Sequence, residues 1–455
     1  MSLLSHVRQE IKKLDLQKDR PVALKIQNDA LHLATSIALL EAEYSQTTIP
    51  SFMGSQQRET LESRIGNYST ICDINFSKNT LKIAALTLQI PGLESRANNK
   101  FFEIKNNKSS IFLQTSGTTS EPKLIKLSIE DLLYQAERHP EYFDSKYLRL
   151  NSCQHKNTLR HRLYVYFMGG TNIFMQKPNI DSLSAYCEEH SPDIIDITSY
   201  HFSQIYQAKT SIPSQTKIVV AGSSIDMTLL QKAAEMYSLF IRYGTTETGT
   251  LAICGPIQAD TKKLQYEINK NASVRIGSDS TVDNKEGLIY IHAKGVGRSA
   301  DEIFLKRKHE KPHWHNTGDL GLIDQNGELQ IIGRACEMII FNSRNINPLE
   351  IESVLQRHPK VIRCAAFPIE SKIHGQIPAA AVETIEPDSV SEIELLELCR
   401  EKLGFSRPRK IHITNESIID ANSGKTNRTE LSKLFSAKQC LNLLSPTILL
   451  VSQKS

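Results

Sequence analysis

Several patterns that would place this 455-residue chain in a familiar class of protein are missing from it. Its eight cysteines lie far apart and form no Cys-x-x-Cys pair, which argues against a zinc site or a disulfide framework and fits free thiols in a reducing compartment. Charge of one sign does not predominate, because 54 basic and 50 acidic residues leave a formal net charge of +4. We therefore expect no nucleic-acid or anionic-membrane partner.

Long hydrophobic runs are absent as well. Residues 1–20 lack the apolar core that a signal peptide needs. The apolar stretch at 441–451 contains Asn442 and Pro446 and is too short to span a bilayer. We expect a soluble, cytoplasmic protein of ordinary globular composition, with 40% hydrophobic and 23% charged residues.

Strand-like and helix-like segments alternate over most of the first 330 residues. The run PVALKI (21–26) predicts a strand, and ALHLATSIALLEAE (30–43) a helix that follows it, which is typical of α/β layers. The pattern is β-rich over 283–332 and then changes to a compact α+β pattern. We predict an α/β fold in three parts: a large layered N-terminal body with a β-rich subdomain (1–333), a hinge (334–337) and a small mobile α+β C-terminal lid domain (338–455).

The first segment that indicates chemistry is IFLQTSGTTSEPK (111–123). An apolar strand runs into small hydroxyl residues around a glycine, so that backbone N–H groups and hydroxyls can surround a phosphate chain. The candidate phosphate-binding residues are Thr115, Ser116, Gly117, Thr118, Thr119 and Lys123. The spacing does not satisfy GxxxxGK[ST], which disfavours a Walker-type NTPase. The segment closely resembles the TSG[ST]TGxPKG signature of the adenylate-forming superfamily, which includes acyl- and aryl-CoA synthetases, peptide-synthetase adenylation domains and firefly luciferase.

A second segment, RYGTTETG (242–249), resembles the YGxTE motif of the same superfamily. The resemblance implies that Tyr243 packs against adenine, that Thr246 donates to the α-phosphate, and that Glu247 helps to hold Mg²⁺. A carboxylate on Mg²⁺ beside a phosphate is the expected arrangement. By the same resemblance, the nucleotide also contacts Gly222, Ser223, Ser224, Gly244 and Thr245.

Three further motifs follow in the family's order. HNTGDLGLID (315–324) matches TGDL, and the resemblance implies that Asp319 accepts both ribose hydroxyls. GRACEMIIFNSRNINPLEIE (333–352) places Arg334 near the ribose as well. NSGKTNR (422–428) resembles the terminal [NS]GKxxR motif, in which Lys425 is the mobile catalytic lysine. A cation there offsets the repulsion between an attacking carboxylate and a polyanion.

The chain departs from the family pattern at a few positions. Ser120 and Leu124 replace two glycines of the phosphate loop, and Cys336 stands where the hinge usually has Asp or Lys. Ser343 replaces a glycine that lines the path of the incoming pantetheine thiol in the family. A serine narrows that path, so this departure bears on the thiol-transfer step more than on adenylation.

The resemblance places the acid substrate near residues 150–175, Gly222 and Gly244. His155 falls where many relatives carry a histidine at the mouth of the pocket; it either contacts the substrate or is a hydrogen-bonded structural histidine. A polar cluster follows it, and this cluster either favours a small, polar or aromatic acid or is a solvated helix face: Lys156, Asn157, Arg160, His161 and Arg162.

Together these features predict an enzyme that uses ATP and Mg²⁺ to convert a carboxylic acid into its acyl-adenylate. The acyl group then passes to a thiol, either of CoA or of a separate carrier protein. Lys425, Thr246 and Glu247 are the predicted catalytic residues. Two alternatives are adenylation with a non-thiol acceptor and a catalytically inactive ligand-binding homologue.

Overall fold

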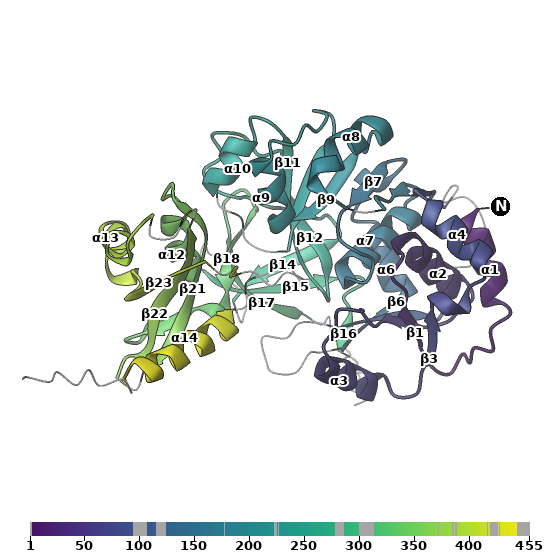
Figure 1. Cartoon of the computed structure of the whole chain (residues 1–455), viewed down its shortest axis with the longest axis horizontal. Coiled ribbons are helices and arrows are strands. Elements are labelled where there is room, and N and C mark those ends of the chain that lie inside the picture. The colour runs from purple at the N-terminus through teal and green to yellow at the C-terminus, as the bar shows by residue number, and fades with distance from the viewer. Residues whose placement is uncertain are drawn as a thin grey trace, which may run out of the picture. The chain divides into compact units, whose positions relative to one another are not determined.

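The computed structural model describes residues 2–93, 107–114, 124–176, 178–222, 225, 227–277, 286–299, 314–371, 373–384, 386, 389–415, 417, 418, 426 and 428–443, without the side chains of 56 and 436–443. The chain divides into two compact units. The body comprises residues 1–223, 229–317 and 321–331, and the C-terminal unit comprises 224–228, 318–320 and 332–455. The fold is mixed α/β, as predicted (Figure 1).

Two large sheets and one smaller sheet form the framework of the body. The first has the order β16-β6-β5-β2-β1-β3, with β1 (Val22–Lys25), β2 (Gln46–Thr48), β3 (Ser69–Cys72), β5 (Ser110–Gln114), β6 (Leu124–Ser128) and β16 (Arg298–Ser299). The second has the order β13-β12-β11-β10-β9-β7-β8-β4, with β4 (Gln89–Ile90), β7 (Lys146–Arg149), β8 (Thr171–Ile173), β9 (Ile194–Thr198), β10 (Lys217–Ala221), β11 (Ser238–Thr245), β12 (Gly249–Cys254) and β13 (Glu267–Ile268). The third has the order β14-β15-β17-β18, with β14 (Ala272–Ile276), β15 (Gly287–Ala293), β17 (His315–Ile323) and β18 (Leu329–Arg334).

The helices of the body follow the predicted alternation. They are α1 (Leu3–Ile11), α2 (Asp29–Glu41), α3 (Ser55–Ile65), α4 (Lys78–Leu86), α6 (Ile129–Ala136), α7 (Lys156–Phe167), α8 (Ile180–His190), α9 (Ser199–Gln207) and α10 (Met227–Ala233), with short 3-10 turns η1 (Asp73–Asn75) and η2 (Pro140–Tyr142). The strand and helix predicted over 21–43 are confirmed as β1 and α2. Residues 30–40 of α2 are all buried, as expected for a helix that is apolar on every face.

The C-terminal unit is a sheet covered on both faces. The sheet contains β19 (Ile339–Phe341), β20 (Arg344–Ile346), β21 (Val361–Ser371), β22 (Gly375–Thr384) and β23 (Lys410–Thr414). The helices are α12 (Pro348–Leu355), α13 (Glu392–Leu403) and α14 (Arg428–Leu443), with 3-10 turns η3 (Ala335–Glu337) and η4 (Gly404–Ser406). Alternate residues of β21 face opposite sides, so that Cys364 and Ala366 pack with α12 and α13, whereas Phe367 packs with Phe435 of α14.

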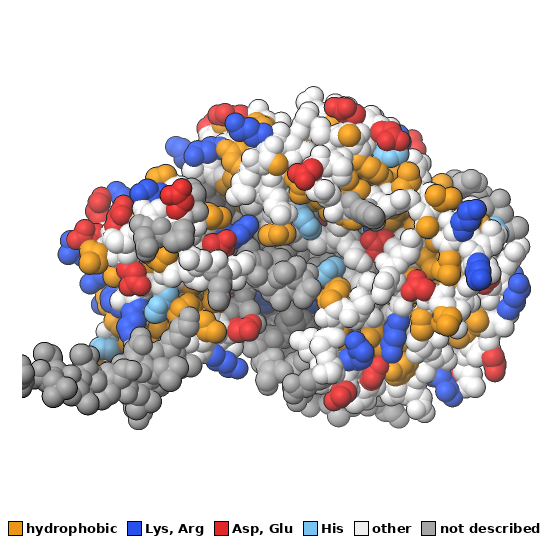
Figure 2. Space-filling view, viewed as in Figure 1, with side chains coloured by type: hydrophobic (Ala, Val, Ile, Leu, Met, Phe, Trp, Pro, Cys, Tyr) orange, Lys and Arg blue, Asp and Glu red, His pale blue; other side chains and the backbone are white. Residues whose placement is uncertain are grey.

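Charges of both signs are intermixed among the described side chains on the face shown in Figure 2. This distribution agrees with the small formal net charge of +4. No helix in the described part of the chain is long and apolar enough to cross a bilayer.

Candidate functional site

Three predicted site residues lie at one edge of the second sheet. Strands β7, β9, β10 and β11 are parallel neighbours, so their carboxyl ends share that edge. His155 follows β7, Gly222 follows β10, and Thr246 follows β11. The crevice outside the carboxyl ends of parallel strands is where open α/β sheets bind ligands. The parallel topology therefore brings together residues that are about 90 positions apart in the sequence.

The YGTTE segment forms a tight hairpin turn at this edge. Strands β11 and β12 are antiparallel, with Thr245 opposite Gly249, so that residues 246–248 make the turn. Thr246 and Glu247 are half-buried, whereas Thr248 is buried and its hydroxyl accepts from the N–H of Thr245 at 3.0 Å. A Cβ on Gly244 would overlap the backbone of Gly249, so the close approach of the two strands requires glycine there. Gly244 thus has a structural role in addition to any contact with a ligand.

Tyr243 and Arg242 point to opposite faces of the sheet, as neighbouring strand residues do. The Tyr243 ring lies 6.1 Å from that of Tyr266. Arg242 is buried and pairs with Asp196, which also binds Arg149 at 3.0 Å. Burial raises the pKa of Asp196, but the two guanidiniums outweigh this effect and hold the pKa below its ordinary value. The ion pair between the charged Asp196 of β9 and Arg242 therefore holds β11 in place on the face opposite Tyr243.

Three of the five polar residues of the α7 cluster are buried and Lys156 and Asn157 are half-buried, so the interpretation of this cluster as a solvated helix face is wrong. Arg160, His161 and Arg162 are 3%, 4% and 1% exposed. Arg162 donates to the carbonyl of Ile173 at 3.1 Å and its guanidinium lies 4.2 Å from the Phe174 ring. The terminal nitrogens of Arg160 and Arg162 donate to backbone carbonyls, and His161 lies 3.1 Å from the Tyr142 hydroxyl.

His155 precedes the first turn of α7 and stacks on Phe52, with ring centroids 4.7 Å apart. Its neighbour Lys156 donates to the carbonyl of Gln114 at 2.8 Å, at the end of β5. Since β5 and β6 pair as an antiparallel hairpin, the predicted phosphate loop is their connection. Several predicted residues lie outside the described part of the chain: Thr115, Ser116, Gly117, Thr118, Thr119, Ser120, Lys123, Ser223, Ser224 and Lys425.

The structure pairs the two residues predicted to bind ribose. Arg334 Nε lies 2.8 Å from Asp319 Oδ1, because β17 and β18 are neighbouring strands of one sheet. The Asp319 side chain is 8% exposed, whereas that of Arg334 is 43% exposed. A largely buried carboxylate held by one arginine is preorganised to accept hydrogen bonds from hydroxyl groups.

Arg428, three residues after Lys425, is anchored inside the C-terminal unit. Its guanidinium binds Glu352 at 2.8 Å and Glu337, in η3, at 2.9 Å, and its Nε donates to the carbonyl of Ala366. Glu352 also accepts from the N–H of Ala366 at 2.8 Å. The terminal motif and the predicted hinge therefore share one ion-pair network.

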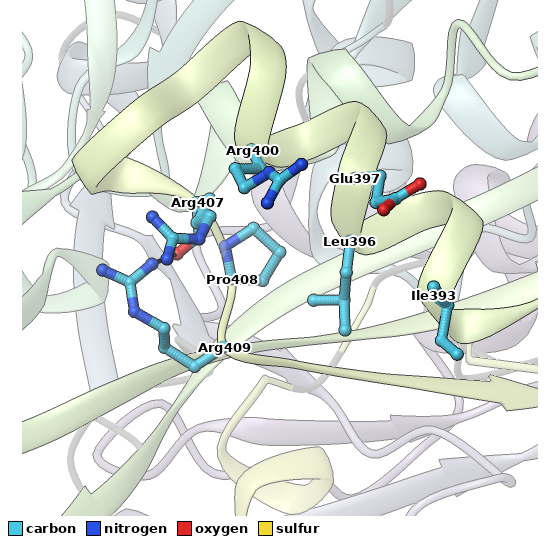
Figure 3. A pocket seen from close by; sticks show the side chains of 7 residues that line it. All are labelled: Ile393, Leu396, Glu397, Arg400, Arg407, Pro408 and Arg409. Atoms are coloured by element: carbon cyan, nitrogen blue, oxygen red, sulfur yellow. Dashed lines mark hydrogen bonds between the residues drawn. The ribbon is translucent and has the colours of Figure 1, made fainter.

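The C-terminal unit also carries a small pocket of about 260 Å³ between α13 and the segment that precedes β23 (Figure 3). It is lined by Ile393, Leu396, Glu397, Arg400, Arg407, Pro408 and Arg409. Arg407 and Arg409 donate to backbone carbonyls, and among the described residues none of the three arginines has a carboxylate within ion-pair distance. Burial and the neighbouring Arg407 lower the pKa of Arg409. The pocket thus presents cations beside an apolar floor.

Comparison with known proteins agrees with the motifs. The family described as AMP-binding enzyme matches residues 9–299, and the AMP-binding enzyme C-terminal domain matches 350–425. The peroxisomal trans-cinnamate:CoA ligase of Petunia hybrida is 25% identical, over 70% of this chain and 61% of that protein. The 2-succinylbenzoate–CoA ligase of Bacillus pumilus is 24% identical, over 68% of this chain and 66% of that protein. The chain thus spans somewhat less than two thirds of the length of these relatives.

Solved structures share the fold. The O-succinylbenzoate coenzyme A synthetase of Bacillus subtilis, in complex with AMP, superposes with a TM-score of 0.77 at 20% identity, covering 94% of this chain and 91% of that chain. The amide bond synthetase McbA of Marinactinospora thermotolerans superposes with a TM-score of 0.76 at 17% identity, covering 95% and 93%.

Proposed function

Because the chain belongs to the AMP-binding enzyme family, we propose that it activates a small carboxylic acid with ATP and Mg²⁺ and then transfers the acyl group to the thiol of CoA. The observation that carries this proposal is the turn between β11 and β12. There a hydroxyl and a carboxylate, Thr246 and Glu247, stand side by side at the carboxyl edge of parallel strands. A hydroxyl donor and a metal-binding carboxylate are what the α-phosphate of Mg·ATP needs.

The donor set suits Mg²⁺ better than a metal held by protein alone. Among the described residues there is no group of three or more His, Cys, Asp or Glu side chains that could hold a metal ion. Mg²⁺ is usually bound by one or two carboxylates together with substrate phosphates, and Glu247 supplies one carboxylate. When bound, the ion neutralises charge that develops on the phosphates.

In the proposed first step, a carboxylate oxygen of the acid attacks the α-phosphorus of ATP. The bond from this phosphorus to the bridging oxygen breaks, and pyrophosphate leaves with the electron pair. Thr246 donates to the α-phosphate and Lys425 lies between the two anions, where its charge offsets their repulsion. Asp319 and Arg334 orient the ribose. In the second step, the thiolate attacks the acyl carbonyl, and AMP leaves with the electrons of the acyl–oxygen bond.

CoA is favoured over a carrier protein as the acceptor by the arginine-lined pocket. Arg400, Arg407 and Arg409 offer cations for the phosphates of a nucleotide, and Leu396 and Pro408 offer apolar surface (Figure 3). Relatives named as CoA ligases support the same acceptor. Replacing Arg407 with alanine should raise the KM for CoA roughly tenfold, the effect of losing one charge-assisted hydrogen bond. An unchanged KM would favour the carrier protein.

The test is acid-dependent exchange of pyrophosphate into ATP, with a panel of aryl, short-acyl, long-acyl and amino acids. We expect exchange with an aryl or short-chain acid, and a loss of two to three orders of magnitude in Lys425→Ala, on the order of that seen when one preorganised charge-stabilising group is removed. Asp319→Ala should instead raise the KM for ATP. If no acid supports exchange although ATP binds, the proposed function is wrong and an inactive ligand-binding homologue remains. If exchange occurs but CoA neither speeds the release of AMP nor yields an acyl-CoA, CoA is not the acceptor.

A further inference from the structure

Backbone carbonyls of the β11–β12 turn accept hydrogen bonds from Arg160 of α7. Arg160 Nη1 donates to the carbonyl of Thr246 at 2.6 Å and lies 3.4 Å from that of Thr245. Its other terminal nitrogen, Nη2, donates to Asn157 Oδ1 at 3.1 Å, which fixes the guanidinium on its own helix. Arg160 therefore binds the two peptide groups that flank Thr246.

Gln135 of α6 and Arg138, two residues after the end of this helix, continue the same contact along the turn. Gln135 Nε2 donates to the carbonyl of Glu247 at 3.2 Å, and Gln135 Oε1 accepts from the Tyr164 hydroxyl. Arg138 Nη1 donates to the carbonyl of Thr248 at 2.5 Å and lies 3.4 Å from that of Thr250. We call Gln135, Arg138 and Arg160 the carbonyl clamp, since these three side chains hold the carbonyls of residues 245–248 and 250.

The clamp is buried and carries uncompensated charge. Gln135, Arg138 and Arg160 are 0%, 5% and 3% exposed. Neither arginine has a carboxylate within ion-pair distance among the residues that the structure describes. A buried guanidinium that binds only carbonyl dipoles costs stability relative to an apolar side chain of similar size. Stability alone therefore does not explain the clamp, and its positive charge points to a role in function.

The geometry of the peptide group sets the direction of the N–H groups of Thr246 and Glu247. In a trans peptide the C=O and N–H bonds point in opposite directions. Since the carbonyls of Thr245 and Thr246 point to Arg160, the N–H groups of Thr246 and Glu247 point away from it. Neither N–H has an acceptor within the described parts of the chain. Two adjacent outward N–H groups with a cation behind them form a site suited to an anion.

We propose that Arg160, supported by Gln135 and Arg138, is a positioning residue that holds the Thr246–Glu247 turn in the conformation that receives the phosphates of Mg·ATP. This inference rests on the proposed function, in which Thr246 and Glu247 meet ATP. Arg160 itself acts through the backbone and does not touch the substrate.

The experiment compares Arg160→Gln and Arg160→Lys with the matched control Arg162→Gln. Arg162 lies on the same helix, is 1% exposed and also donates to backbone carbonyls, at 3.1 Å for Ile173, but it has no contact with the turn. Mg·ATP affinity is measured by calorimetry at several Mg²⁺ concentrations, and the melting temperature by circular dichroism. We expect Arg160→Gln to weaken Mg·ATP binding at least tenfold, on the scale of a hydrogen bond to a charged group, and to raise the Mg²⁺ concentration for half-saturation. Arg160→Lys keeps the positive charge but not the planar guanidinium, so its affinity for Mg·ATP should lie between those of the wild type and Arg160→Gln.

Arg162→Gln should lower the melting temperature while its Mg·ATP affinity stays within twofold of the wild type. If both glutamine variants melt earlier and neither loses affinity, Arg160 is merely structural and the inference is overturned. Should Arg160→Gln not fold, Asn157→Ala releases the guanidinium without emptying the site, and an unchanged affinity in that variant overturns the inference equally.

The outcomes also separate this inference from the proposed function. Wild-type protein that binds Mg·ATP but exchanges pyrophosphate with no acid contradicts the proposed function. A loss of affinity in Arg160→Gln under those conditions still supports the carbonyl clamp.

Discussion

His161 provides a test of how deeply the polar core of the body is buried. Its ring is 4% exposed, lies 3.3 Å from Arg242 Nη1 and is 3.1 Å from the Tyr142 hydroxyl. Burial, followed by the repulsion of Arg242, holds its pKa well below the ordinary 6.5. The folded protein therefore keeps His161 neutral while the unfolded chain takes up a proton. The stabilisation is complete above the unfolded pKa and is lost as the pH falls below about 6.5, by about 1.4 kcal/mol for each pH unit.

Between pH 8 and pH 5 this single group should thus remove about 2 kcal/mol from the free energy of unfolding, a sizeable part of a typical 5–15 kcal/mol. The perturbation is His161→Gln, which is neutral at both pH values, and the control is the exposed His292→Gln. Urea unfolding at the two pH values gives, for the wild type and each variant, the loss in free energy of unfolding between pH 8 and pH 5. We expect the loss to be about 2 kcal/mol smaller in His161→Gln than in the wild type and unchanged in His292→Gln. An equal loss in all three proteins would refute the argument that His161 is held neutral.

Three further substitutions test other parts of the structure. Ser343→Gly should raise the free energy of unfolding by about 1 kcal/mol, measured by urea titration, because Ser343 has a φ of +61° in a two-residue hairpin turn; an unchanged or lower value would contradict this. Gly244→Ala should slow pyrophosphate exchange at least tenfold and cost about 1–3 kcal/mol of stability, because its Cβ would overlap Gly249; wild-type exchange would show that the hairpin can open without cost. Arg428→Gln should cost about 3–5 kcal/mol by leaving Glu352 as a buried charge, and the reasoning fails if adding Glu352→Gln restores no stability.

Local sequence patterns predicted the strand before the phosphate-loop segment and the strand before Thr246, because each of these motifs begins in or directly after a strand, β5 and β11. The resemblance placed both Asp319 and Arg334 near the ribose, and their ion pair follows from the two adjacent strands that carry them. The carbonyl clamp could not be predicted in this way. Arg160 meets Thr246 across 86 positions of sequence, and its partner is a backbone carbonyl, which every residue type provides. A run such as KNTLRHR has the composition of an exposed helix, whereas backbone carbonyls in the fold allow its two arginines, Arg160 and Arg162, to be buried.

Among its described residues, the body has one fully buried carboxylate, Asp196, but five buried arginines. These arginines are Arg138, Arg149, Arg160, Arg162 and Arg242. Replacing a buried charge network with apolar residues is often neutral or stabilising, so stability alone does not explain this set. Four of the five bind backbone carbonyls or Asp196 close to β11 and its turn. A turn built by hydrophobic packing would have its carbonyls unsatisfied or solvated, whereas guanidiniums satisfy them and add positive charge. The same residues thus fix the turn and favour an anion in front of it, which is the combination that the proposed binding of Mg·ATP at this turn requires.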